Sequence, residues 1–71
     1  STMKISARNA LRGTITEIRG GPLMTEVTVD LGNGQNVVAV VTKTSCERLA
    51  LDVGMAVHAV IKSTDVMIMS D

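Results

Sequence analysis

Residues 25–42 read TEVTVDLGNGQNVVAVVT, and the polarity pattern of this stretch changes at a glycine-rich break. From Thr25 to Leu31, apolar residues alternate with polar ones, which is the period-two pattern of a strand with one buried face. Gly32-Asn33-Gly34 carries the residue types that tight turns favour. Asn36 to Thr42 is apolar on both faces, which is typical of a strand covered on both sides. The stretch therefore predicts two strands joined by a tight turn.

Three further segments on either side of this pair carry strand patterns. Leu11 to Ile18 alternates at first, but Ile18 falls out of phase, which predicts a bulge or a strong bend. Met55 to Ile61 is apolar on both faces, like the strand after the turn. A short polar corner then leads to a last strand at Val66 to Met69. Together with the central pair, these segments predict five strands.

One short helix is expected between the third and fourth strands. Thr44 and Glu47 have capping-box spacing, so a helix is predicted from Thr44 to Leu49, ending near Gly54. Five short strands with a helix at this place are what a small Greek-key barrel of the OB type requires. We therefore predict an all-β fold, a five-stranded Greek-key OB-like barrel with one short helix between strands 3 and 4. An SH3-like barrel is the alternative architecture.

The chain length predicts a single domain, spanning residues 3–71. We interpret Ser1 and Thr2, which precede a start-like Met3, as a possible cloning remnant. A domain of this size buries only about 60% of the surface that its unfolded chain exposes, so it usually needs a staple or a partner. Cys46 is the only cysteine, which rules out an intrachain disulfide. Two strands with two apolar faces therefore favour a homo-oligomer, although valine on an outer face is also compatible with strand propensity alone.

Composition argues against several classes of protein. Seven Lys or Arg balance seven Asp or Glu, and no residue is aromatic. Nucleic-acid-binding modules need a basic footprint and aromatic stacking platforms, so this class is disfavoured. The longest apolar run, Val37 to Val41, is far shorter than the roughly 20 residues that span a membrane. No signal-peptide pattern is present and the cysteine is single, so a reduced, cytoplasmic setting is expected.

Catalytic and metal-binding arrangements are also missing from the sequence. His58 lies within a strand pattern without a nucleophile at a suggestive spacing, and Cys46 is interpreted as a small buried side chain of the helix. Carboxylates are scattered singly, and one Cys with one His does not make a zinc site. The sequence therefore predicts a protein that is not an enzyme and has no metal held directly by protein ligands.

Two polar segments stand out in otherwise apolar surroundings. Ser6-Ala7-Arg8-Asn9 precedes the first strand, and Lys62-Ser63-Thr64 follows the fourth. Each combines a cation with a hydroxyl and backbone N–H groups at a corner, which is the donor set that holds a small oxyanion. A flexible arm and an ordinary solvated turn are the structural alternatives for the two segments.

These segments resemble the molbindins, which are small molybdate-binding proteins. The resemblance rests on the opening Met3-Lys4-Ile5-Ser6-Ala7-Arg8-Asn9, followed by Leu11 and Gly13, and on the close from Ala59 to Met67. The middle agrees, with a strand ending in Thr42 and the segment Leu49 to Gly54 after the helix. Similar modules occur in a molybdate-responsive repressor and in molybdate transporter ATPases.

The resemblance implies an OB-like barrel assembled as a hexamer, a trimer of dimers, with molybdate or tungstate at subunit interfaces. The binding positions of the family correspond here to Ser6, Ala7, Arg8, Thr42, Lys62 and Ser63. Asn9 also matches, either as a ligand or as a residue that holds the backbone. The implied function is non-catalytic storage, buffering or delivery of the oxyanion. The alternatives are an oxyanion-sensing module of a repressor or transporter, and an OB-type nucleic-acid module.

Overall fold

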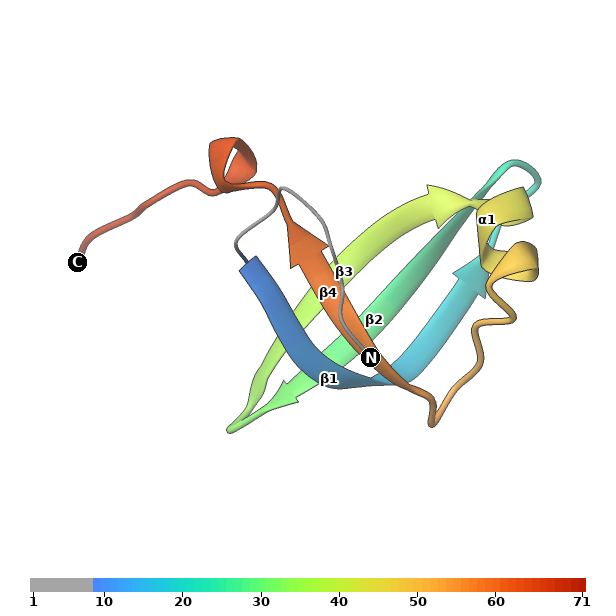
Figure 1. The fold of residues 1–71 in the computed structure, drawn as a ribbon, viewed down its shortest axis with the longest axis horizontal. Helices are drawn as coiled ribbons and strands as arrows, with labels where there is room; N and C mark the ends of the chain where they lie inside the picture. Colours follow the sequence, from blue (N-terminus) through green and yellow to red (C-terminus); the bar gives the residue numbers. More distant parts are fainter. Residues whose placement is uncertain (1–8) are drawn as a thin grey trace.

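The computed structural model describes residues 9–71, which form an antiparallel sheet that curls into a half-barrel (Figure 1). The strands are β1 (Asn9–Gly20), β2 (Met24–Gly32), β3 (Gln35–Thr42) and β4 (Ala56–Ile61). Helix α1 (Lys43–Arg48) lies between β3 and β4, and a 3-10 turn, η1 (Ser63–Asp65), follows β4. The strand order is β3-β2-β1-β4, so the fourth strand returns beside the first, as in a Greek-key motif.

The turn between β2 and β3 lies where the glycines predict it. Gly32, Asn33 and Gly34 all have positive φ, at 93°, 54° and 76°. Side chains with a Cβ avoid this region, whereas Gly and Asn tolerate it. The Asp30 side chain also accepts a hydrogen bond from the Gly32 N–H at 3.2 Å. The prediction of two strands joined by a tight turn is therefore confirmed.

A bulge in β1 explains why Ile18 is out of phase. Ile15 pairs with Val29, but the next paired residue of β1 is Glu17, opposite Thr28. The extra residue returns Ile18 to the inner face, where it packs against the core. The predicted bulge is therefore confirmed, and it bends β1 so that the sheet can curl.

The core of the described chain is small. Its buried apolar side chains are Ile15, Val27 and Val29, with Thr25 buried beside them. Ile15 is 1% exposed, and its backbone also bonds to the segment before β4: its N–H donates to the Met55 carbonyl at 3.0 Å. Its carbonyl accepts from the Gly54 N–H at 2.8 Å. The core therefore lies where β1 meets both of its neighbours.

The predicted fifth strand is wrong for this chain on its own. Val66 to Met69 form no strand, and the side chains of Met67, Ile68 and Met69 are 92%, 90% and 93% exposed. Figure 1 shows that this segment leads away from the sheet after η1. A strand needs an edge to pair with, and the turn at η1 directs these residues away from the edges of their own sheet. The described residues therefore form four strands of a half-barrel and do not close the predicted five-stranded barrel.

The helix begins one residue earlier than predicted, and a different threonine caps it. Thr42, not Thr44, is the N-cap, and its hydroxyl accepts a hydrogen bond from the Ser45 N–H at 3.0 Å. Thr42 has the extended backbone of a strand end, which is the conformation an N-cap requires. Thr44 lies inside the first turn, so the predicted capping box with Glu47 does not form.

Cys46, predicted to be buried, is half-buried.

Both edge strands expose apolar side chains on their outer faces. Val38 and Val40 on β3 are 53% and 61% exposed, and Val60 on β4 is 46% exposed. The inner faces of the same strands carry half-buried residues such as Val41 and Val57. The two strands predicted to be apolar on both faces are thus the two edges of the sheet.

Gly13 permits the curl of the sheet, and its replacement by alanine is expected to destabilise the fold. A Cβ at this position would lie 2.5 Å from Val29 Cγ1 and 2.6 Å from the Asp30 carbonyl oxygen. Because the second contact is with backbone, relief requires the strands to separate. We expect Gly13→Ala to lower the free energy of unfolding, measured by urea denaturation, by about 1–3 kcal/mol. Gly20→Ala is the matched control because its Cβ would meet nothing within 4 Å. Equal stability of the two variants would contradict this role of Gly13.

Candidate functional site

The pairing of β1 with β4 brings the two polar segments of the sequence together. Asn9, the first residue of β1, pairs with Ile61, the last residue of β4. The Asn9 side-chain Nδ2 also donates a hydrogen bond to the Ile61 carbonyl at 3.3 Å. Asn9 therefore holds the backbone immediately before Lys62. The predicted site residues Ser6, Ala7 and Arg8 precede Asn9 in sequence and lie outside the described residues.

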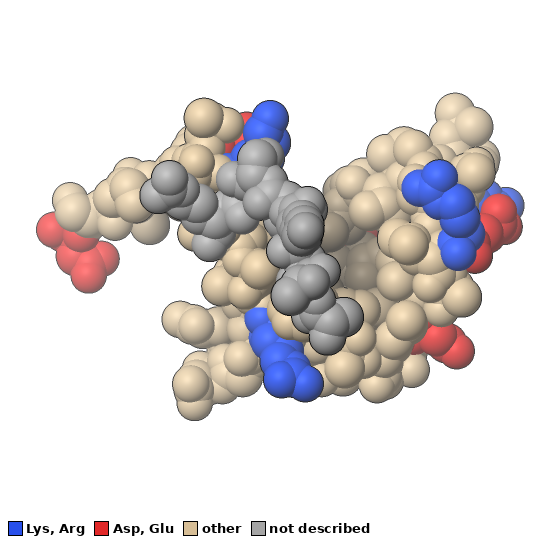
Figure 2. All heavy atoms as spheres, in the orientation of Figure 1, with Lys and Arg blue, Asp and Glu red and all other residues tan. Residues whose placement is uncertain are grey.

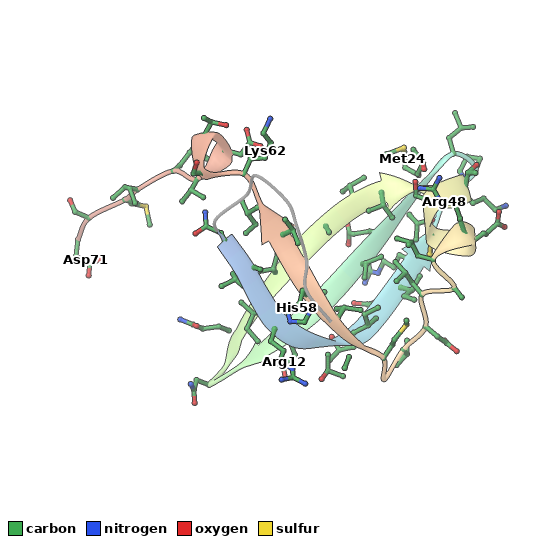
Figure 3. The ribbon with its side chains drawn as sticks, in the orientation of Figure 1. Arg12, Met24, Arg48, His58, Lys62 and Asp71 are labelled. Atoms are coloured by element: carbon green, nitrogen blue, oxygen red, sulfur yellow. The ribbon has the colours of Figure 1, made fainter. Side chains whose placement is uncertain are left out.

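Lys62 and Ser63 form a corner at the end of β4. Lys62 has extended backbone and is the N-cap residue that precedes η1, and its carbonyl accepts a hydrogen bond from the Asp65 N–H at 2.9 Å. Both side chains are exposed, and Lys62 lies beside η1 in Figure 3. Within residues 9–71, no carboxylate lies within ion-pair distance of the Lys62 amine. The ammonium of Lys62 is therefore not neutralised by the part of the chain that the structure describes.

Thr42 lies at the other end of the sheet. β1 is 12 residues long, and it pairs with Ile61 at its first residue and with Thr25 at its last. Thr42 pairs with Met24, next to Thr25. Figure 3 shows the resulting separation between Lys62 and Met24. The structure thus brings Asn9, Lys62 and Ser63 together but does not bring Thr42 to them within one chain.

The Thr42 hydroxyl already has two hydrogen-bond partners. Besides capping α1, it donates to the Ser45 hydroxyl at 2.8 Å. The proton of the Ser45 hydroxyl is then free to point elsewhere, because Ser45 accepts in this bond. Ser45 was not among the residues predicted from the sequence. The signal available for it is the spacing of two hydroxyl residues three apart across a strand-to-helix junction.

Charge on the described surface is dispersed. The ion pair among residues 9–71 joins Arg19 Nε to Glu17 Oε2 at 2.9 Å, and both side chains are mostly exposed. The Glu17 hydrogen bond and charge, with a further contribution from Glu26, raise the pKa of the Arg19 guanidinium above its usual value. On the face that Figure 2 shows, basic side chains are scattered, some of them beside acidic ones, and form no continuous stripe. Residues 9–71 also contain no group of three or more His, Cys, Asp or Glu placed to hold a metal ion.

A hollow on the inner face of the sheet is a different kind of surface. It has a volume of about 470 Å³ and an almost entirely apolar lining. Side chains from β3 (Ala39 and Val41) and from β4 (Val57 and Ala59) line it, with Ile15 at its base. An oxyanion needs N–H, O–H or cationic groups in place of its hydration shell. The lining of the hollow does not supply the donors that an oxyanion needs.

Comparison with known proteins gives one family. Residues 5–68 match the model of the TOBE domain. The chain is 38% identical over 68 residues to molybdenum-pterin-binding protein 1 of Clostridium pasteurianum, covering 96% of this chain and 100% of that protein. It is 43% identical over 70 residues to the molybdenum transport protein ModE of Herbaspirillum seropedicae. That match covers 99% of this chain but only 26% of ModE, so the chain spans about a quarter of this longer relative.

Two solved structures have the same fold. A molybdate-binding protein from Sporomusa ovata superposes with a TM-score of 0.90 at 37% identity, covering 96% of this chain and 100% of that one. The cytoplasmic molybdate-binding protein ModG, solved with molybdate bound, superposes with a TM-score of 0.81 at 39% identity. The match covers 86% of this chain and 43% of ModG.

The chain therefore belongs to the TOBE-domain family, as a molbindin of the Mop type. This confirms the resemblance that the opening and closing motifs indicate. Molbindins bind their ligand without catalysis, so the family assignment also supports the prediction that the protein is not an enzyme. Among the described residues, no helix has the length and apolar character needed to cross a bilayer.

The cap on α1 provides a test of Thr42 that does not depend on a ligand. Thr42→Ala removes the acceptor for the Ser45 N–H, and losing an N-cap costs about 0.5–2 kcal/mol. We expect this decrease in the free energy of unfolding by urea denaturation in molybdate-free buffer. Thr42→Ser keeps the hydroxyl and should stay close to wild type. A Thr42→Ala protein as stable as wild type would show that the cap contributes nothing.

Proposed function

We propose that the protein binds molybdate or tungstate without catalysis, at sites formed between subunits of a homo-oligomer. The observation that supports this most directly is the pairing of Asn9 with Ile61. Asn9 directly follows the Ser6-Ala7-Arg8 motif in the sequence, and Ile61 directly precedes Lys62-Ser63. Family membership supplies the ligand class.

The chemistry of these residues suits a tetrahedral dianion. Such an ion arrives hydrated, so the site has to replace its water shell with fixed donors. Lys62 supplies a compact charge and Arg8 a planar cation with several N–H donors. The hydroxyls of Ser6 and Ser63 and the backbone N–H of Ala7 add neutral donors. Asn9 acts as a positioning residue, because its amide holds the strand end from which Lys62 projects.

Completion of the site needs a second chain. Thr42 belongs to the proposed ligand shell, yet it lies at the opposite end of the sheet from Lys62 in the same chain. A single copy therefore cannot place both residues on one small ion. A homo-oligomer can, and the proposed assembly is a hexamer built as a trimer of dimers. The exposed valines on both edge strands support association of copies.

The proposed role is storage, buffering or delivery of the oxyanion in the cytoplasm. The full-length match to a molybdenum-pterin-binding protein favours a protein that acts through binding alone. The similarity to ModG, described as cytoplasmic, supports the compartment. A ligand that binds only the assembled state also stabilises that state by mass action, so binding and assembly would be coupled.

A second candidate is an oxyanion-sensing module within a larger regulator or transporter. The match to about a quarter of ModE favours it, because nearly the whole chain is covered. The site chemistry would be the same, and the difference would lie in the conformational response of attached domains. A nucleic-acid role is disfavoured because the sequence has no aromatic residue and no net positive charge.

Lys62 is the residue on which the proposed site depends most. Lys62→Ala should weaken molybdate binding by roughly thirty-fold to several thousand-fold, because truncating one member of a desolvated charge pair costs about 2–5 kcal/mol. Isothermal titration calorimetry with sodium molybdate measures the effect.

Lys43→Ala is the matched control, since Lys43 is exposed at the start of α1 and lies outside the proposed ligand set. It should bind close to wild type, because exposed charges contribute only about 0–1 kcal/mol. Tight binding by an assembled Lys62→Ala protein would reject this site while leaving the family membership intact.

A further inference from the structure

The tip of the β2–β3 hairpin contains an asparagine followed by a glycine. Asn33 and Gly34 are the two residues between the paired positions Gly32 and Gln35, and both are exposed. Among residues 9–71, neither the Gly34 backbone N–H nor the Asn33 side chain makes a hydrogen bond. The tip therefore places an unbonded backbone amide directly after an unbonded side-chain amide.

These two groups can react with each other. The Gly34 amide nitrogen loses its proton to a base in the solvent and attacks the side-chain carbonyl carbon of Asn33, Cγ. The bond from Cγ to Nδ2 breaks, and Nδ2 leaves as ammonia after taking up a proton. The product is a cyclic succinimide, which water opens at either of its two carbonyls. One opening gives aspartate at position 33, and the other gives isoaspartate, whose main chain runs through the former side chain.

The other two asparagines of the described chain lack this combination. Asn36 lies within β3, and the residue after it is Val37, whose stiff β-branched side chain hinders attack by its own backbone amide. Asn9 lies in β1, and its Nδ2 is bonded to the Ile61 carbonyl. Gly34 has no Cβ to hinder the attack, and the tip residues can leave their turn conformation without breaking the pairing of β2 with β3.

We propose that Asn33 converts spontaneously to isoaspartate and aspartate, and that this modification loosens the β2–β3 hairpin. Isoaspartate inserts an additional carbon atom into the main chain between Asn33 and Gly34. The tight turn that joins Gly32 to Gln35 then loses its geometry, and turn type and length are what fix the register of a hairpin. Both products also add a carboxylate to the turn in which the Asp30 side chain already accepts the Gly32 N–H.

Strand β3 is the element that depends on this turn. It is an edge strand, and among the described residues its one strand neighbour is β2. Its last residue is Thr42, which caps α1. A hairpin that loosens at its tip therefore weakens the strand that carries Thr42. The reaction needs neither a ligand nor a second copy of the chain, so its outcome is independent of the proposed molybdate site.

Peptide mapping of aged protein tests the site. Wild-type protein is incubated at neutral and at alkaline pH, digested with trypsin, and analysed by tandem mass spectrometry and by an isoaspartate-specific methyltransferase assay. Asn33 and Asn36 share one tryptic peptide, because no Lys or Arg lies between Arg19 and Lys43, so Asn36 is an internal control. Asn33 should convert, and faster at alkaline pH because the deprotonated amide attacks, while Asn36 stays an amide. Equal conversion of the two, or an unchanged Asn33 at alkaline pH, overturns the proposal.

Asn33→Gly tests the effect on the hairpin. Glycine accepts the positive φ of this position and has no side-chain carbonyl to attack. Ageing should lower the urea midpoint of the wild-type protein and reduce hydrogen-exchange protection in β3, and it should leave both unchanged in the variant. Wild-type protein that mapping shows to be converted, yet that unfolds at its original midpoint, rejects the loosening of the hairpin. An equal loss of stability in the aged variant rejects it too, because the damage then lies elsewhere.

Discussion

The structure depends on the position of Ile15, where β1 is held from both sides. Its Cα pairs with Val29 of β2, its N–H and carbonyl bond to Met55 and Gly54, and its side chain is 1% exposed. β1 pairs with both β2 and β4, and the bulge after Ile15 bends β1 between these two pairings. The curl of the sheet, the apolar hollow and the meeting of Asn9 with Ile61 all follow from this arrangement.

Local patterns were sufficient for the features that are local in origin. Alternation located β1 and β2, and runs that are apolar on both faces located β3 and β4. The phase of Ile18 located the bulge, and Gly32-Asn33-Gly34 located the turn, because positive φ restricts the residue types. The helix cap was misassigned since Thr42 and Thr44 carry the same hydroxyl, and only the end of β3 decides between them. The fifth strand failed for another reason. Val66 to Met69 have strand character, but whether a strand forms depends on an edge that the segment itself does not specify.

The candidate site shows the same division. The sequence alone shows that Lys62, Ser63 and Asn9 carry hydrogen-bond donors. The family that their motifs indicate is confirmed. The sequence does not show that Asn9 lies close to Lys62 and Ser63. Asn9 and Ile61 are 52 residues apart in sequence and meet only through the pairing of β1 with β4. In the described chain, Asn9 donates a hydrogen bond to the Ile61 carbonyl, which favours the backbone-holding role over that of a ligand. The sequence does not predict Ser45, because its hydrogen bond with Thr42 forms only where β3 passes into α1.

Stability and binding have a common physical origin in this molecule. Among the apolar side chains of residues 9–71, only Ile15, Val27 and Val29 are buried, and the sequence has no aromatic residue to enlarge this core. Apolar surface that a larger domain would cover internally remains on the edges of the sheet and on Met67, Ile68 and Met69. A second copy can cover that surface, and the same copy can bring Thr42 toward another chain's Lys62. If both requirements are met by one contact, the affinity for the oxyanion is linked to the free energy of assembly, since a ligand that binds only the assembled state shifts the equilibrium toward it. A small core is then compatible with a stable protein in the proposed oligomer, because an interface between copies would supply the burial that the fold of one chain lacks.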